Sequence, residues 1–166
     1  MYRKIDDFLK DWKTEEEFTL KIFSLISAQS KSERIHEDVR TLDRLAWHLT
    51  QTITEMGKRA GLLAEDLLEH QEIPETMEMI SDIYKTNSDL LCRAVHLKWT
   101  DSTLDDLVPM YGDEWMKGKI LHILLIHQTH HRGQMTVIMR VLGITVPGLY
   151  GPSKEEWVSM GLPAMD

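Results

Sequence analysis

The sequence is short of cysteine, proline and glycine, and it has no long hydrophobic run. Its one cysteine, Cys92, excludes an internal disulfide and a cysteine-rich zinc site. Five prolines and nine glycines in 166 residues leave room for long uninterrupted helices. The longest strongly apolar run, residues 123–126, is far below the roughly 20 residues that a membrane-spanning helix needs. No apolar stretch of signal-peptide length follows the N-terminal charges, so we expect a cytoplasmic protein without a membrane partner.

The balance of charge excludes another class of partner. Lys and Arg total 19 against 27 Asp and Glu, which gives a formal net charge of -8. A net-acidic chain repels phosphate backbones, and no run of basic residues offsets this repulsion, so we expect no nucleic-acid partner. Hydrophobic residues make up 42% of the chain, which is enough for the core of one domain spanning residues 1–166.

Apolar residues recur at helical spacing in several long stretches. The stretches that predict helices are residues 14–30, 41–60, 74–99 and 113–142. Thr14, with Glu17 three residues later, has the spacing of a capping box and predicts where the first helix begins. Glycines and prolines that follow these stretches favour helix ends there.

The remaining segments complete the predicted architecture. We expect a loop over residues 101–112, a short helical segment over 62–70, and one helical turn near 153–158 in the C-terminal tail. Strand alternation does not persist anywhere in the sequence. We therefore predict an all-α fold, a four-helix bundle with a short C-terminal extension, and keep a less regular all-α fold as the alternative.

Histidine is the residue type that points to chemistry. Eight histidines occur, and four of them lie in the segment HILLIHQTHHRGQ. His127 and His131 are four residues apart, which places both imidazoles on one face of a helix. They also fall within the apolar stripe of the fourth predicted helix, which reads Ile120, Leu124, His127, His131, Met135, Ile138 and Leu142. A shared divalent cation would satisfy both imidazoles, but each can also be a hydrogen-bonded histidine of the core or its rim.

A metal site needs a third ligand, and His48 is the best candidate. It follows Leu45 by three residues and precedes Thr52 by four, so it lies at the inward edge of the second predicted helix. Facing helices of a bundle build metal sites by pointing such side chains inward. The other five histidines, His36, His70, His96, His122 and His130, are more simply surface residues. His48, His127 and His131 would form a three-histidine site with open coordination positions.

Two neighbours of these histidines limit the possible chemistry. Gln128 stands where the HExxH motif of zinc metalloproteases has its general-base glutamate, and an amide cannot accept a proton in that role. Gly133 interrupts the fourth predicted helix at a cost of about 1 kcal/mol relative to alanine. Two interpretations of Gly133 are open. Either a substrate or a second helix needs to approach the backbone closely at this point, or the helix simply tolerates the glycine. Gln134, three residues after His131, is placed to contact either the mouth of the site or a neighbouring helix.

The segments LDRLAWHLTQTI, with His48, and IHQTHHRGQ, with His127 and His131, closely resemble the DinB/YfiT-like family of metalloenzymes. The resemblance covers about residues 14–142, and HRGQ is its most specific part. It implies a four-helix bundle that binds a divalent transition metal through these three histidines. Zinc and nickel are the metals that we expect most at this site, and iron, manganese and copper are the alternatives. It also implies a homodimer.

The family includes enzymes that transfer a low-molecular-weight thiol, such as bacillithiol, to an electrophile, and a mycothiol-dependent isomerase. The first hypothesis is accordingly a metal-dependent thiol transferase whose partners are a small-molecule electrophile and a cellular thiol. The second is a hydrolase that uses metal-bound water as the nucleophile. The third is a non-catalytic metal-binding protein of a stress response. The sequence leaves the catalytic acid or base undetermined.

Overall fold

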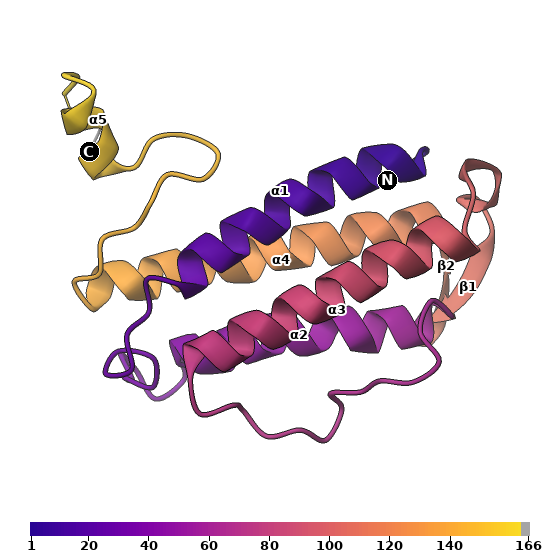
Figure 1. Ribbon diagram of the computed structural model, residues 1–166, viewed down its shortest axis with the longest axis horizontal. Coiled ribbons are helices and arrows are strands. Elements are labelled where there is room, and N and C mark those ends of the chain that lie inside the picture. Colours follow the sequence, from indigo (N-terminus) through magenta and orange to yellow (C-terminus); the bar gives the residue numbers. More distant parts are fainter. Residues whose placement is uncertain (164–166) are drawn as a thin grey trace.

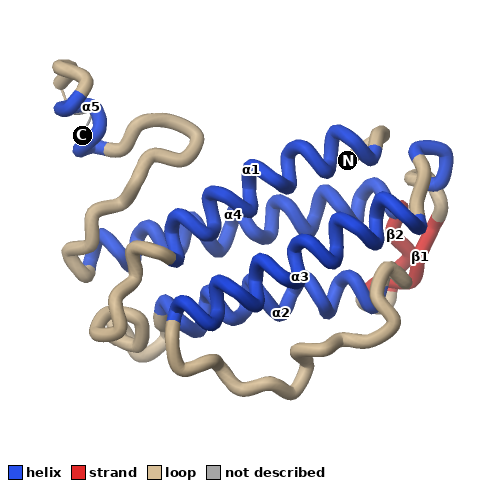
Figure 2. The backbone as a smooth tube through the Cα atoms, viewed as in Figure 1, coloured by secondary structure: helices blue, strands red, loops and turns tan. Residues whose placement is uncertain are grey.

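The computed structural model describes residues 1–163. It consists of four long helices, a small hairpin and a C-terminal arm, residues 142–163 (Figures 1 and 2). The four long helices are α1 (Ile5–Phe23), α2 (Leu42–Arg59), α3 (Met77–Lys98) and α4 (Lys117–Val141). Figure 1 shows that α2 and α3 run in the same direction and are joined by a crossover along the outside of the bundle. The predicted all-α bundle is therefore confirmed.

The packing of the helices brings α2 and α4 together. Helix α1 packs against α3 and α4, and α2 packs against the same two helices, so α1 and α2 occupy opposite corners. The apolar stripe predicted for α2 is buried throughout, as shown by Leu42, Leu45, Leu49, Ile53 and Met56. Every histidine on the inward edges of α2 and α4 therefore faces the same seam of the bundle.

The first helix begins earlier than the sequence predicted. It starts at Ile5 and ends at Phe23, and the hydroxyl of Thr14 donates to the carbonyl of Lys10 in mid-helix instead of capping an end. The inward face carries Phe8 and Trp12 before a polar interval. The predicted range of 14–30 was wrong because buried acidic residues interrupt the apolar periodicity of this helix.

The connection between α3 and α4 is not the simple loop that was predicted. A 3-10 turn, η1 (Asp101–Thr103), leads into strand β1 (Leu107–Met110), which pairs antiparallel with β2 (Asp113–Met116). The two residues of the turn, Tyr111 and Gly112, both have positive φ, 52° and 84°, as a tight hairpin requires. Helix α4 therefore starts at Lys117, four residues later than the predicted start.

The other connections differ from the prediction in one place and agree in another. Residues 62–70 form turns and bends instead of a helical segment. The helical turn predicted near 153–158 is confirmed as α5 (Lys154–Ser159), which is capped by Ser153. Figure 1 shows this arm standing away from the end of the bundle.

The last three residues of the predicted tail lie outside the described range. No helix of residues 1–163 has the length and hydropathy needed to cross a membrane.

Candidate metal centre

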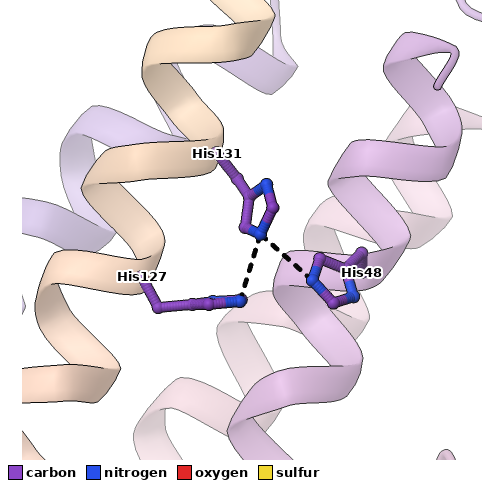
Figure 3. A group of neighbouring side chains, drawn as sticks. All are labelled: His48, His127 and His131. Carbon is purple, nitrogen blue, oxygen red and sulfur yellow. Dashed lines mark hydrogen bonds between the residues drawn. The ribbon is translucent and has the colours of Figure 1, made fainter. Parts of the chain in front are cut away.

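The seam between α2 and α4 brings together the three histidines that the sequence singled out (Figure 3). His48 comes from α2, and His127 and His131 come from successive turns of α4. The Nε2 atom of His131 lies 3.1 Å from the Nε2 atom of His48 and 3.1 Å from that of His127. One ligand atom from each ring lies within 4.8 Å of the others. The three rings thus converge on one small volume.

The two separations of 3.1 Å fit ligands of a single coordinated ion. Imidazole nitrogens bind divalent transition metals at about 2.0–2.1 Å, so neighbouring ligands at octahedral or tetrahedral angles lie about 2.8–3.4 Å apart. The described residues offer no fourth histidine, cysteine, aspartate or glutamate to this group. A site with three protein ligands keeps positions open for small molecules, as catalytic metal sites do.

Hydrogen bonding alone does not satisfy the three rings. The Nδ1–H of His131 donates to Oε1 of Gln134 at 2.7 Å, which leaves the Nε2 atom of His131 as a bare acceptor. One lone pair accepts one good hydrogen bond, yet two other Nε2 atoms lie within 3.1 Å of it. The Nδ1 atom of His127 is buried and has no partner among the described residues. A cation bound by all three Nε2 atoms accounts for the convergence better than hydrogen bonds between imidazoles.

The environment keeps all three imidazoles neutral, which is the form that binds metals. Burial is the largest cause, and it lowers the pKa of His48 and of His127 to about 4. Burial also lowers the pKa of His131, although its hydrogen bond to Gln134 acts in the opposite direction. The positive charge of Arg40 lowers all three pKa values further, and that of Arg44 lowers the pKa of His48. Free Nε2 lone pairs are therefore available at neutral pH.

Gln128, the residue that argued against a metalloprotease, has a structural role. It is fully buried, its Nε2 donates to the carbonyl of Leu49 at 3.1 Å, and its Oε1 accepts from the hydroxyl of Tyr84 at 3.3 Å. Its amide thus ties α4 to α2 and α3 and takes no part in the histidine cluster. Gln134, in contrast, contacts the site, which is one of the two contacts expected from the sequence.

The other candidate residues lie outside the cluster. His130 is exposed as predicted, whereas His122 is half-buried and packs edge-on against the ring of Tyr2. The side chain of Cys92 lies in a different part of the bundle, where burial raises the pKa of its thiol to about 12. A thiol that stays protonated is a poor nucleophile, so this environment does not activate Cys92.

Sequence reasoning missed a polar network directly beside the centre. The guanidinium of Arg132 forms a buried ion pair with Glu15 and donates to the hydroxyl of Thr19 at 2.9 Å. The hydroxyl of Tyr150, in the C-terminal arm, donates to the same carboxylate at 2.6 Å. This network ties α1 and the arm to the turn of α4 that carries His131. The only local signal was an arginine next to a predicted inward-facing histidine.

A pocket of about 580 Å³ adjoins the centre at His131 and Gln134. The connector between α1 and α2 contributes four of its lining residues, and many of the others are aliphatic. The remaining lining residues are Ile35, Asp38, Val39, Arg40, Leu45, Val137 and Ile138. Its volume lies in the range of small-molecule binding sites, about 300–1,000 Å³. The centre is therefore bordered by space for an organic ligand.

The fold and the site together define a helical bundle with a three-histidine centre between two neighbouring helices. The chain matches the model of the DinB family over residues 1–162, and it belongs to that family. It is 38% identical to the uncharacterized protein YrdA of Bacillus subtilis (strain 168) over 164 residues, which are 99% of this chain and 98% of that protein. The membership that the HRGQ segment suggested is thus confirmed.

Two solved structures are similar to this fold. A DinB-like protein from Bacillus cereus ATCC 10987 is 35% identical and superposes with a TM-score of 0.83, covering 90% of this chain and 100% of that chain. The DinB-like protein YjoA from Bacillus subtilis is 18% identical, with a TM-score of 0.70 over 88% of this chain and 99% of that chain. The second likeness concerns the fold alone.

Proposed function

We propose that the protein is a metal-dependent transferase that joins a low-molecular-weight thiol, of the bacillithiol kind, to an electrophilic small molecule. His48, His127 and His131 are the proposed ligands of a divalent transition metal, with zinc or nickel first. When bound, the ion supplies Lewis-acid chemistry that lowers the pKa of a thiol reaching it. The observation that carries the proposal is the convergence of three neutral imidazoles beside a pocket, with open coordination positions.

The residues around the centre favour a thiol over water as the nucleophile. Activating water requires a large change in pKa, from about 15.7, and commonly a general base, whereas a free thiol starts near 8.5. The histidine cluster contains no carboxylate. The one carboxylate that lines the pocket, Asp38, is 86% exposed and lies 3.7 Å from Nδ1 of His36. The site therefore suits a nucleophile that loses its proton easily.

The chain's own residues have separate tasks in this reaction. Gln134 orients His131 through the hydrogen bond to Nδ1, and the aliphatic pocket wall excludes water from the reactants. The thiolate sulfur forms a bond to the electrophilic carbon, while the bond from that carbon to the leaving group breaks. The leaving group departs with the electron pair, and the thiol proton passes to solvent.

Metal content is the first test. Protein made without a polyhistidine tag is analysed for transition metals, as wild type, His127→Ala and His130→Ala. We expect about one ion per chain in wild type and in His130→Ala, whose histidine is exposed beside the cluster, and loss of the ion in His127→Ala. Equal metal content in all three proteins, including none, would remove the proposed centre.

Thiol conjugation is the second test. Metal-loaded protein is mixed with monochlorobimane and, in turn, bacillithiol, cysteine and glutathione, and fluorescence reports the conjugate. We expect conjugation with at least one thiol in wild type and His130→Ala, and none in His48→Ala. Turnover of ester or amide substrates without any thiol would favour the hydrolase instead. Stoichiometric metal without either activity would favour a non-catalytic metal-binding protein.

The homodimer and the single domain expected from the sequence stay predictions. Light scattering at high micromolar concentration tests the first, since a homodimer has about twice the mass of the 19.3 kDa chain. Limited proteolysis tests the second, because one domain resists cleavage as a unit.

A further inference from the structure

The pocket beside the centre has one unpaired positive group in its wall. Arg40, near the end of the connector between α1 and α2, lines the pocket together with His131 and Gln134. The residue is exposed, and its guanidinium makes no hydrogen bond or ion pair with another described residue. The guanidinium of Arg132, in contrast, is buried in an ion pair with Glu15 and also donates a hydrogen bond to Thr19, so it is not available to a ligand. The donors of Arg40 are thus free for a ligand.

Two arginines lie near the centre, although the chain has a formal net charge of -8. Arg40 lines the same pocket as His131, and Arg44 lies one helical turn before His48 on α2. The group of three histidines itself contains no carboxylate. A cluster of neutral ligands would also leave the charge of a bound divalent ion uncompensated. Fields of one sign around a cleft concentrate ligands of the opposite sign.

Much of the pocket wall is aliphatic, which limits the kind of anion. Ile35, Val39, Val137 and Ile138 supply this aliphatic surface in the same pocket as His131. A small inorganic anion would leave this aliphatic surface exposed to water, whereas the apolar part of an organic acid would bury it, which is favourable. Asp38 lies in the same wall, but its carboxylate is 86% exposed and beside His36, so water screens its repulsion of an anion.

We propose that Arg40 binds a carboxylate of the small-molecule reactant, so that this pocket selects organic acids with an apolar body. The carboxylate accepts hydrogen bonds from the guanidinium, the apolar body lies against Val39 and Val137, and the reactive end lies toward His131. The inference deepens the proposed thiol transfer and rests on it for the reactive end. Recognition of the carboxylate by Arg40 does not require any turnover.

The test compares a carboxylate with its neutral amide. Hexanoate and hexanamide are titrated by calorimetry into metal-free and zinc-loaded protein, as wild type, Arg40→Gln, Arg40→Lys and Arg44→Gln. Arg44 is the matched control, because it is exposed and four residues away but does not line this pocket. Circular dichroism confirms that each exposed-arginine variant is folded. Because variants are compared in the same metal state, any direct contact between the carboxylate and zinc contributes equally to both and cancels.

We expect wild type and Arg44→Gln to prefer hexanoate over hexanamide by about tenfold, the size of one charge-assisted contact. Arg40→Gln should lose this preference in both metal states, and Arg40→Lys should keep part of it. A preference that is absent in wild type, or unchanged in Arg40→Gln, overturns the inference.

A second assay separates this inference from the proposed function. Mercaptohexanoate and mercaptohexanamide replace the cellular thiols in the conjugation reaction. If the metal-loaded protein turns over both thiols equally, the result supports the proposed transferase activity and contradicts carboxylate recognition by Arg40. If neither thiol reacts but hexanoate still binds through Arg40, the result supports carboxylate recognition and contradicts the proposed transferase activity.

Discussion

Arg132 and Glu15 form a buried ion pair that joins α4 to α1 one residue beyond His131 of the centre. The arginine side chain is 1% exposed, and its Nη1 also donates to the backbone carbonyl of Glu15 at 3.1 Å. A guanidinium held at several points fixes the rotation of α4 about its axis. The pair therefore helps to aim His127 and His131 at α2.

Replacing Arg132 should be among the most damaging single changes in the chain. Arg132→Gln leaves the carboxylate of Glu15 buried without its cation, so the free energy of unfolding should fall by about 3–5 kcal/mol. Urea denaturation followed by circular dichroism measures this loss. Arg140→Gln is the control, because its partner Glu155 is exposed and solvent screens that pair, so it should cost little. A loss for Arg132→Gln no larger than that of the control would contradict the role of the buried pair.

The contact between Gln134 and His131 should control metal affinity without affecting the fold. Gln134→Leu removes the acceptor that orients the imidazole, and loss of such a partner typically weakens metal binding by about 10–100-fold. Gln134→Glu keeps an acceptor at the same place and should retain affinity. Competition with a chromophoric zinc chelator measures the dissociation constants. Wild-type affinity in Gln134→Leu would show that His131 needs no such support.

Two glycines of α4 should respond in opposite ways to alanine. A Cβ at Gly133 would meet no atom within 4 Å, so Gly133→Ala should stabilise the protein by up to about 1 kcal/mol. A Cβ at Gly118 would clash with the carbonyl oxygen of Tyr2, so Gly118→Ala should destabilise it. Thermal unfolding of both variants checks the signs. A clear loss of stability in Gly133→Ala would mean that the close-approach interpretation of this glycine was right after all.

Periodic features of the molecule could be predicted from the sequence, and long-range polar features could not. The stripe of α2 and the i, i+4 spacing of His127 and His131 repeat locally, so residue spacing is enough to locate the two helix faces that form the site. Helix α1 was misplaced because Glu15 and Glu16 lie on its buried face, where helical periodicity predicts apolar residues.

The reason that these acids are buried lies far away in the chain. Arg132, the partner of Glu15, is 117 residues distant, and no local pattern records such a pair. Glu16 likewise accepts a hydrogen bond from Ser88, 72 residues away on α3. The hairpin of β1 and β2 was missed for another reason. Its strands are four residues each, too short to show a period of two.

Asp43 should make the stability of the protein depend on pH in the acid range. It lies in the first turn of α2, five residues before His48, and its carboxylate accepts hydrogen bonds from Ser32, Thr41 and the backbone N–H of Arg44. Burial alone would raise the pKa of this carboxyl, but these hydrogen bonds and the charge of Lys31 outweigh it and lower the pKa.

Because the pKa of Asp43 is lower in the folded protein than the usual value of about 3.9, its ionised form stabilises the fold. This stabilisation is fully present above the unfolded pKa and is lost as the pH falls through the folded pKa. We expect Asp43→Asn to be less stable than wild type at neutral pH, with a difference that shrinks below about pH 4. Urea denaturation across that range measures the difference. Asp105→Asn, whose carboxylate is exposed, corrects for the general effect of removing one charge. If the difference in stability between wild type and Asp43→Asn stays constant from neutral to acid pH, the charge of Asp43 does not contribute, and its hydrogen bonds and packing account for the effect.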